Sequence, residues 1–434
     1  MVQIYRPQKR QQQTVVQEVT ITDLDLHGQG VGRHNGLVCF VPGALPGEKV
    51  KARLTVKGKV ATGRLQGLLV ASDERVEPRC EYVGRCGGCQ LQHLPVASQL
   101  NYKEAALKGE LQRAGIAVAQ WQPALTGAEF GYRRTLRLAI FDGKLGFRAV
   151  GSQNIIPVSH CAVAEPALSK LLPSLQGLLP RLKGQRHLGH LELLHLPPHT
   201  AALWRLTGAL PKADMEKLIA WAQAEDVVLY TQQQEITQHW PQQPQALGYR
   251  LDDLELSVGP ADFIQVNGSI NQAMVAQALA WLAPSQDERV LDAYSGLGNF
   301  SLPLCKRAKA VVAVEGVAAM TERNRHNAEL NGLTNLDART LDLDDQSAVA
   351  ALVAEGFEAA LLDPARPGAQ ALCQALASGT GPGRVLYVSC NPSTWKRDAA
   401  LLAQGGYRLL RLGLMDMFSQ TAHVELMALF IREG

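Results

Sequence analysis

The last third of the chain places acidic side chains and a cysteine directly after short apolar segments. Asp292 follows "RVL", Asp363 follows "ALL" and Cys390 follows "LYVS". If these segments are parallel strands, their carboxyl ends meet at one edge of a sheet, where open α/β sheets bind ligands. A cysteine held there by a turn containing Pro392 could act as a nucleophile, and a nearby carboxylate as a base. The spacing therefore predicts a reactive edge, although a single cysteine in such a sheet is more often a core residue.

A glycine-containing turn, "DAYSGLGNFS", indicates a nucleoside site at the same edge. Gly296 and Gly298 allow the backbone to approach a ligand closely. Glu315 ends the next apolar segment, where an acid can accept hydrogen bonds from ribose hydroxyls, and Asp342 ends the third. The turn lacks the third glycine or the lysine of phosphate-binding loops. We therefore expect a nucleoside without phosphates, and S-adenosylmethionine fits, the alternative being an α/β domain with incidental acids.

A thiolate beside a methyl donor suits methylation of a pyrimidine carbon. C5 of uracil is a poor nucleophile, but attack of a thiolate on C6 gives an enolate whose C5 can accept a methyl group. A base must then remove the C5 proton so that the thiol can leave. Cys390 is the predicted nucleophile, Glu425 in "HVELMALF" the predicted base, and Asp363 the group that holds the pyrimidine edge. His423 is a second possible base.

The elements that must position these residues are read from periodicity. Residues 259–434 alternate apolar strands with amphipathic helices, which predicts a doubly wound α/β domain. Residues 14–72 read as short alternating strands separated by glycine and proline, which predicts a small antiparallel barrel. Residues 73–258 mix strands and helices, so we expect a central α+β domain whose topology the pattern does not order.

Two features of the central region are more specific. Residues 94–114 read as a helix ended by Gly115, which could pack on the catalytic domain, and "DGK" at 142–144 indicates a hairpin turn. The segment around this hairpin is expected to present a basic face to RNA. That face comprises Arg133, Arg134, Arg137, Lys144 and Arg148.

Composition limits the class of protein. Apolar residues make up 46% and charged residues 19% of the 434 residues, as in a globular protein. The net charge is +3, but basic residues outnumber acidic ones within residues 1–75, a mild sign of a polyanionic partner. No apolar run reaches the roughly 18 residues of a membrane span, and the polar N-terminus is no secretory signal. We expect a cytoplasmic protein that has no membrane partner.

Apart from Cys390, the eight cysteines of the chain fall into two groups. Cys80, Cys86 and Cys89 form C-x₅-C-x₂-C, and Cys161 comes next. In a reducing compartment such clustering indicates metal binding, and four thiolates suit either zinc or an iron–sulfur cluster, with His93 and His160 as further zinc ligands. The remaining cysteines apart from Cys390 lie in apolar patterns and are expected in the core: Cys39, Cys305 and Cys373.

Several motifs together resemble the RNA uracil-5-methyltransferase family. They are "DFIQVN" at 262–267, the glycine turn, "LLDPAR", "YVSCNP" and "HVELM". The segment "GQGVGRHNGLVCFVPGALPGE" resembles the TRAM domain, an OB-like RNA-binding barrel. The resemblance covers nearly the whole chain. It implies a TRAM barrel at 14–72, a central domain at 73–258 and a Rossmann-like S-adenosylmethionine-dependent methyltransferase domain at 259–434.

The resemblance also implies roles for individual residues. Cys390 would be the nucleophile and Glu425 the base. The donor pocket would comprise Gln265, Tyr294, Asn299, Glu315, Asp342 and Asp363. Phe263 would offer a stacking surface to a flipped base. The clustered cysteines would bind a [4Fe–4S] cluster through Cys80, Cys86, Cys89 and Cys161. Ala293 and Ser295 depart from the family, which usually has a bulky apolar residue and a cysteine there, so we expect an altered pocket lining.

The TRAM segment, the cysteine cluster and the chain length most resemble the bacterial members of the family that act on 23S ribosomal RNA. We therefore expect C5-methylation of one uridine in 23S rRNA, to 5-methyluridine, by a monomer that flips the base into its site. The cluster would be structural or would orient the RNA, because its spacing differs from the C-x₃-C-x₂-C of radical enzymes. The alternatives are a tRNA uracil-5-methyltransferase and an RNA-binding protein with an inactive methyltransferase domain.

Overall fold

The structure, a computed structural model, describes residues 14–240, 246–378 and 381–432 and divides into two compact units. The first comprises the described residues up to Gly84 together with Cys89–Leu107 and Gln420–Ala422. The second comprises Arg85–Gly88, Lys108–Ser419 and the described residues from His423 onward. Within the described ranges, no helix is long and apolar enough to cross a membrane.

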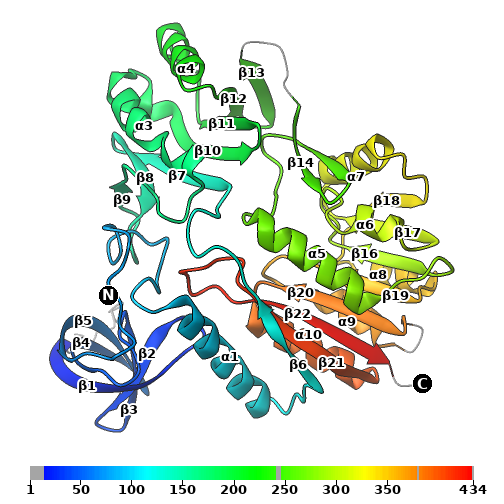
Figure 1. Cartoon of the computed structure of the whole chain (residues 1–434), viewed down its shortest axis with the longest axis horizontal. Helices are drawn as coiled ribbons and strands as arrows, with labels where there is room; N and C mark the ends of the chain where they lie inside the picture. Colours follow the sequence, from blue (N-terminus) through cyan, green and yellow to red (C-terminus); the bar gives the residue numbers. More distant parts are fainter. Residues whose placement is uncertain (1–13, 241–245, 379–380, 433–434) are drawn as a thin grey trace, which may run out of the picture. The chain divides into compact units, whose positions relative to one another are not determined.

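The first unit contains a closed five-stranded barrel, as predicted from the alternating pattern of residues 14–72, but the barrel is not wholly antiparallel, because its strands Leu37–Pro42 and Val60–Val70 pair in parallel. The strands follow the order β1-β2-β3-β5-β4 around the barrel (Figure 1). They are β1 (Thr14–Leu24), β2 (Gln29–His34), β3 (Leu37–Pro42), β4 (Lys49–Lys57) and β5 (Val60–Val70). At Gly32 a Cβ atom would lie 2.4 Å from the Thr20 carbonyl oxygen, so β1 and β2 can pair this closely only because residue 32 is glycine.

Helix α1 (Val96–Arg113) agrees with the helix expected over residues 94–114. Its residues up to Leu107 belong to the first unit and those from Lys108 to the second. Within the second unit, Glu110 on α1 forms an ion pair of 2.6 Å with Lys396. The C-terminal part of α1 thus contacts the part of the chain that carries the predicted catalytic residues.

The second unit contains a seven-stranded sheet of order β13-β12-β11-β10-β7-β8-β9 and a separate hairpin, β14-β15. The strands are β7 (Thr135–Phe141), β8 (Lys144–Arg148), β9 (Ile155–Pro157), β10 (Leu188–Leu196), β11 (His199–Leu206), β12 (Val228–Gln233), β13 (Ile236–Trp240), β14 (Leu247–Leu251) and β15 (Leu254–Val258). The helices are α2 (Pro166–Ser169), α3 (Leu172–Leu178), η1 (Leu179–Arg181), η2 (Gln185–His187) and α4 (Lys212–Ala224). Asp142 and Gly143 have φ of 51° and 68° between β7 and β8, which confirms the predicted hairpin turn.

The same unit contains an eight-stranded sheet of order β18-β17-β16-β19-β20-β22-β21-β6. Its first five strands in this order are mutually parallel, β22 is antiparallel to β20 and β21, and β6 is parallel to β21. The strands are β6 (Gln120–Leu125), β16 (Arg289–Ala293), β17 (Ala310–Glu315), β18 (Leu336–Thr340), β19 (Ala359–Leu362), β20 (Arg384–Ser389), β21 (Tyr407–Met415) and β22 (Glu425–Arg432). The predicted α/β domain is therefore present, with a reversed strand next to β20.

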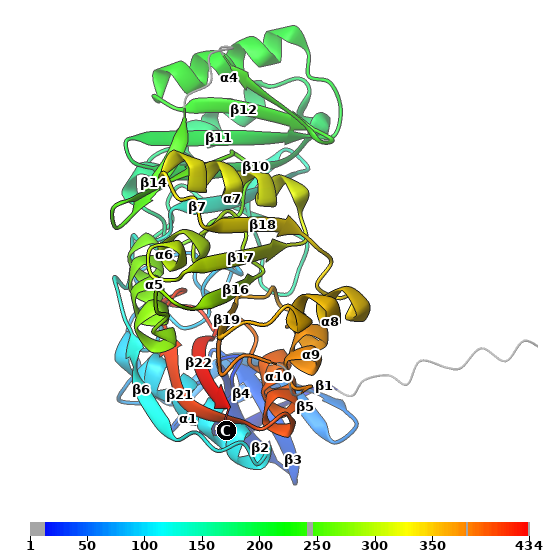
Figure 2. The ribbon, with the colours of Figure 1, turned by 90° about the vertical axis from the view of Figure 1, so that its right-hand side faces the viewer.

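Helices cover both faces of the eight-stranded sheet (Figure 2). One group is α5 (Gly268–Leu282), α6 (Ser301–Cys305) and α7 (Ala318–Leu330), and the other is α8 (Gln346–Ala354), α9 (Gln370–Leu376) and α10 (Pro392–Gln404). The central strands are apolar along their length because both of their faces are buried, as Val311, Leu361 and Leu386 show with 0% exposure. This burial makes the edge at the strand ends the place where polar side chains can gather.

Candidate active site

The carboxyl ends of β16, β19 and β20 bring three of the predicted side chains to one edge of the sheet. Asp292 is the penultimate residue of β16, while Asp363 directly follows β19 and Cys390 directly follows β20. These strands are parallel and adjacent, so their carboxyl ends point the same way. The shared edge that we expected from the sequence is therefore present.

Glu425 reaches the same edge from the reversed strand. In the antiparallel pairing of β20 with β22, Leu426 lies opposite Ser389. One step further in this register, Glu425 lies opposite Cys390. The acid and the thiol are thus neighbours on two adjacent strands, and the register of those strands brings them together.

The surroundings of Cys390 keep its thiol protonated in the free protein. Its pKa is raised to about 11, first by burial and then by the negative charges of Glu425 and Asp363, while Arg366 acts in the opposite direction. Protonation of either carboxylate would remove part of this effect. The reactivity of the thiol is therefore linked to the charge of the two acids beside it.

Asp363 is itself only partly ionised near neutral pH. Burial raises its pKa to about 7. Its backbone N–H donates a hydrogen bond of 3.3 Å to the carbonyl oxygen of Ala293, which ties the end of β19 to the end of β16. A carboxyl group in this state can be a hydrogen-bond donor as well as an acceptor, which suits recognition of a pyrimidine edge.

The loop after Asp363 is held against the start of α10. Asn391, the N-cap residue of α10, accepts a hydrogen bond from the Ser393 N–H at 3.1 Å and donates one of 3.0 Å to the Arg366 carbonyl oxygen. Thr394 donates to the same carbonyl at 2.9 Å. Because Asn391 directly follows Cys390, these bonds connect the backbone beside the thiol to the loop of Asp363.

The glycine turn after β16 has the geometry that close ligand approach requires. Gly296 and Gly298 have φ of 55° and 104°, in the left-handed region that favours glycine. A Cβ atom at Gly298 would lie 2.3 Å from a Leu302 side-chain carbon, so a larger residue does not fit. Glu315 accepts hydrogen bonds from the Gly296 N–H at 3.0 Å and the Val317 N–H at 2.9 Å, one on each oxygen. Its carboxylate is thus oriented toward the turn and keeps further lone pairs for a ligand.

Asp292 lies beneath this turn and is fully buried. Its Oδ2 accepts a hydrogen bond of 2.5 Å from Ser301, whose hydroxyl in turn accepts one of 2.9 Å from Asn324. Burial raises the pKa of Asp292 to about 7, and the charges of Asp363 and Glu315 act in the same direction. The edge therefore gathers several carboxyl groups and is a favourable place for a cation.

The other residues of the predicted donor pocket differ in what they contact. Asn299 has its carboxamide bonded to Asn271 in both directions at 2.9 Å, so it is committed to a protein partner. Gln265 is half-buried, and its carbonyl oxygen accepts a hydrogen bond. Tyr294 has a positive φ of 63° and a buried hydroxyl without a hydrogen-bond partner among the described residues. Asp342 is exposed and lies two residues beyond the end of β18, not at its end as we expected.

The two remaining candidates lie at the surface. Phe263 is 71% exposed, which is unusual for a phenylalanine and leaves its ring accessible. His423 is exposed, and its ring centroid lies 5.1 Å from that of Phe418. Their roles as stacking surface and alternative base stay predictions.

The predicted basic face is wrong for one residue. Arg134 is buried, with 6% exposure, whereas Arg137, Lys144 and Arg148 are exposed and Arg133 is half-buried. The residue directly precedes β7, and its side chain points into the protein because side chains alternate between the two sides of an extended segment. Arg134 is therefore not available to bind RNA from this face.

The eight cysteines differ in their burial. Cys39, Cys305 and Cys373 are buried, as predicted, and Cys80, Cys86, Cys89 and Cys161 are half-buried. Among the described residues, no three His, Cys, Asp or Glu side chains form a group that could hold a metal ion. The structure thus does not confirm the predicted cluster.

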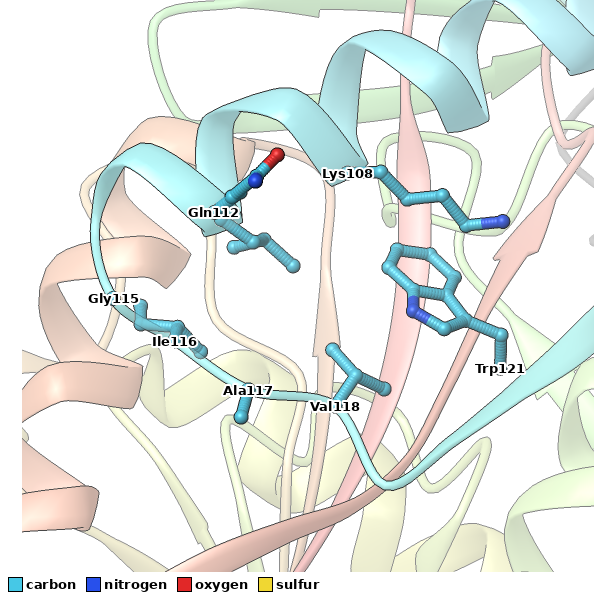
Figure 3. Close-up of a pocket in the computed structure, with 8 residues that line it drawn as sticks. Lys108, Gln112, Gly115, Ile116, Ala117, Val118 and Trp121 are labelled. Atoms are coloured by element: carbon cyan, nitrogen blue, oxygen red, sulfur yellow. The ribbon is translucent and has the colours of Figure 1, made fainter.

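A separate pocket of about 350 Å³ lies at the end of α1 and the start of β6 (Figure 3). In it, the Lys108 ammonium lies 4.7 Å from the centroid of the Trp121 ring. Because β6 is parallel to β21, which runs in the direction of β20, the start of β6 lies at the end of the sheet opposite Cys390. None of the predicted site residues lines this pocket, and we do not assign it to catalysis.

Sequence reasoning missed the contacts that three polar residues make with the predicted donor pocket. Arg134, Tyr249 and Asn271 all contact residues of the predicted donor pocket. Asn271 gave a usable signal, because it is a polar residue within the apolar pattern of α5. Nothing in the pattern around Tyr249 distinguishes it from an ordinary strand residue.

Two family models match this chain. The model of the tRNA (uracil-5-)-methyltransferase family matches residues 201–433, and the TRAM domain model matches residues 10–65. The 23S rRNA (uracil(1939)-C(5))-methyltransferase RlmD of Aeromonas salmonicida is 44% identical, over 99% of this chain and 100% of the relative. The protein of the same name from Pseudomonas aeruginosa is 46% identical, over 95% of this chain and 94% of the relative.

A solved structure supports the fold. The tRNA (uracil-54, C5)-methyltransferase of Pyrococcus abyssi, in complex with S-adenosyl-L-homocysteine, matches with a TM-score of 0.74 and 24% identity. The match covers 96% of this chain and 100% of that one. One family model spans more than half of the chain, and a relative with 44% identity covers 99% of it. The chain therefore belongs to the RNA (uracil-5-)-methyltransferase family and carries a TRAM domain.

Proposed function

We propose that the chain methylates C5 of one uridine in 23S rRNA with S-adenosylmethionine as the methyl donor. The observation that carries this proposal is the position of Glu425 opposite Cys390 on neighbouring strands, with Asp363 at the end of the next strand. A nucleophile, a base and a group that can donate a hydrogen bond are the three parts that C5-methylation of uracil needs. The choice of 23S rRNA rests on the full-length relatives that are named for it.

In this proposal Cys390 begins the reaction. Its thiolate adds to C6 of the uracil, and the electron pair of the C5–C6 double bond moves onto the carbonyl group at C4. Asp363, protonated in part because its pKa is about 7, donates a hydrogen bond to the pyrimidine edge. The C5 carbon then takes the methyl group that S-adenosylmethionine supplies when bound.

Glu425 completes the reaction. It removes the proton from C5, the C5–C6 double bond re-forms, and the thiolate of Cys390 leaves C6. The position opposite Cys390 suits this step, because C5 and C6 are adjacent atoms of one ring. His423 would be the alternative base, and the register of β22 favours Glu425.

The donor would lie over the glycine turn. Glu315 would bind the ribose hydroxyls with lone pairs that its backbone partners leave free. Gln265, Tyr294, Asp342 and Asp363 would complete the pocket, with Asn299 fixing the turn through its bonds to neighbouring side chains. The pKa of about 7 at Asp292 supports this placement, because a nearby sulfonium cation would stabilise the charged form of this buried acid.

RNA binding would involve the TRAM barrel and exposed arginine and lysine side chains around the β7–β8 hairpin. The target base must leave its stack to reach the sheet edge. Phe263, whose ring is accessible, would stack on the flipped base. The protein is proposed to act as a monomer.

We also propose that Cys80, Cys86, Cys89 and Cys161 bind a [4Fe–4S] cluster. Their chemistry fits, because all four are half-buried cysteines and thiolates are the ligands of such clusters. The Gly88 N–H donates a hydrogen bond of 3.4 Å to the Cys86 sulfur, and such bonds stabilise a coordinating thiolate. A cluster there would link segments far apart in the sequence and would have no part in methyl transfer.

The test is methylation of protein-free 23S rRNA and of tRNA transcripts with labelled donor, followed by mapping of the modified base. We expect the wild-type protein to label C5 of one uridine in 23S rRNA. The Cys390→Ala variant should give no label. Cys305→Ala removes a buried cysteine from the same unit and is the matched control, which should stay active. Label in tRNA alone would replace the proposed substrate, and label in neither RNA would indicate an inactive domain.

A further inference from the structure

Arg134 is a buried cation in the second unit that the proposed chemistry does not use. Its side chain is 6% exposed, and its Nη2 atom is buried without a hydrogen-bond partner among the described residues. Burial of a charged group costs folding free energy unless specific contacts compensate for it. The contacts that Arg134 does make therefore indicate why a cation is placed here.

The first contacts fix the segment that carries Gln265. Nε of Arg134 donates a hydrogen bond of 2.7 Å to the Gln265 carbonyl oxygen. The backbone N–H of Arg134 donates a second, of 2.9 Å, to the carbonyl oxygen of Val266. Two adjacent carbonyl groups of the 262–267 segment are thus bound to one residue, which fixes the backbone from which the Gln265 side chain extends.

The second contact connects Arg134 with the residue that follows the glycine turn, Asn299, through Tyr249. The guanidinium carbon of Arg134 lies 4.4 Å from the centroid of the Tyr249 ring, a cation–π distance. The hydroxyl of Tyr249 donates a hydrogen bond of 3.1 Å to Oδ1 of Asn299. Burial raises the pKa of Tyr249 to about 12, so the phenol keeps the proton that it donates.

Asn299 is held from a second side by Asn271 on α5. Its Oδ1 accepts a hydrogen bond from Asn271 and its Nδ2 donates one back, both at 2.9 Å. With Tyr249 as the further donor, the orientation of the Asn299 amide is fixed completely. Arg134 consequently contacts the Gln265 side of the predicted donor pocket directly and its Asn299 side through one aromatic ring.

We propose that Arg134 is a positioning residue for the methyl donor. It sets the separation of Gln265 and Asn299, and it acts on the second of these through Tyr249. The proposal rests on the proposed function, since that function places Gln265 in the donor pocket and has Asn299 fix the glycine turn over which the donor lies. It predicts that loss of Arg134 weakens binding of the donor and leaves binding of RNA largely unchanged.

The experiment measures donor binding directly. S-adenosylhomocysteine is titrated calorimetrically into the full chain without RNA, and KM values for donor and RNA are measured in parallel. Arg134→Met keeps much of the side-chain volume and should weaken donor binding roughly 10- to 100-fold, the range for losing a hydrogen bond from a charged donor. Tyr249→Phe removes one oxygen and should weaken it about 2- to 10-fold. The double variant should bind no more weakly than Arg134→Met, because both act through one network.

Arg384→Met is the matched control. Arg384 also donates from Nε to a carbonyl oxygen, that of Leu282 at 2.9 Å, but it lies at the opposite end of β20 from Cys390. This variant should lose stability without losing donor affinity. If Arg134→Met and Tyr249→Phe are less stable but bind the donor like the wild type, Arg134 is merely structural and the proposal is overturned.

The outcomes separate this inference from the proposed function. A wild-type protein that binds donor but methylates neither RNA would refute the proposed function, and the donor titrations would still decide the role of Arg134. If Arg134→Met does not fold, Tyr249→Phe decides: unchanged donor affinity in that variant overturns the inference. A wild-type protein that binds no donor overturns both.

Discussion

Replacing Glu425 by glutamine should separate attack at C6 from proton removal at C5. Glutamine keeps the size of the side chain opposite Cys390 but cannot accept the C5 proton at neutral pH. Addition of Cys390 and transfer of the methyl group remain possible, whereas release of the product does not. We expect methylated RNA to remain bound covalently to Cys390.

The size of the effect follows from two contributions. A positioned general base contributes about 10²- to 10⁴-fold, so turnover should fall by that factor. The charge of Glu425 helps to raise the pKa of Cys390 to about 11, so at pH 8 only about one thiol in a thousand is ionised. Glutamine removes that charge and lowers the pKa of the thiol, and each unit of decrease raises the thiolate fraction about tenfold. Adduct formation should therefore not become slower.

Two assays test this reasoning. Labelled RNA is incubated with each variant, and the fraction that stays with the protein after denaturation is measured on a gel. In the free protein, the pH dependence of alkylation at the peptide that carries Cys390 should shift to lower pH in Glu425→Gln. Glu329→Gln removes an exposed charge on α7 and should behave like the wild type in both assays. Normal turnover of Glu425→Gln would show that Glu425 is not the base. An unchanged pH dependence of alkylation would show that the charge of Glu425 does not act on the thiol of Cys390.

Three further predictions concern the loops, the buried acid and the cysteine cluster. Asn391→Ala removes the cap of α10 and the hydrogen bond to the Arg366 carbonyl oxygen. The free energy of unfolding in urea should therefore fall by about 1–2 kcal/mol, and turnover should fall as well. Unchanged turnover would mean that these bonds do not position the thiol. Asp292 has a pKa of about 7 in the folded protein, above its unfolded value of about 3.9, so the stability that its bound proton contributes is lost as pH rises through 7. Between pH 5 and pH 7 the wild type should lose about 2 kcal/mol more stability than Asp292→Asn, and parallel losses would contradict the raised pKa. Cys161→Ser should lose iron and sulfide in metal analysis of the purified protein, whereas zinc in the wild type would exclude an iron–sulfur cluster.

Local pattern was enough to predict the elements that carry the site. The strands β16 to β20 are short apolar runs bounded by turn residues, and their ends coincide closely with Asp292, Asp363 and Cys390. The barrel followed from alternation in the same way, since each strand has one face inside. In both cases the information lies within a few residues of sequence, which is why the patterns were reliable.

Long-range contacts were not available from such patterns. The strand β6 lies about 290 residues before β21 in the chain, yet it forms the edge of the same sheet, and its sequence "QWQPAL" shows no clear alternation. The burial of Arg134 depends on segments near residues 249 and 265, far from it in sequence. A basic residue among other basic residues is reasonably interpreted as part of a surface, and only the tertiary structure shows that one of them faces inward.

The reversed direction of β22 explains how an acid meets the thiol at this edge. A parallel strand delivers the residues that follow it, as β19 and β20 deliver Asp363 and Cys390, whereas β22 delivers the residue with which it begins. Side chains alternate along a strand, so a shift of one residue between β20 and β22 would turn Glu425 to the other face of the sheet. The register is held by apolar side chains of β22 such as Leu426 and Phe430, which are at most 1% exposed. Substitutions that loosen these buried contacts should therefore reduce methylation before they unfold the protein, even though none of them touches RNA or donor.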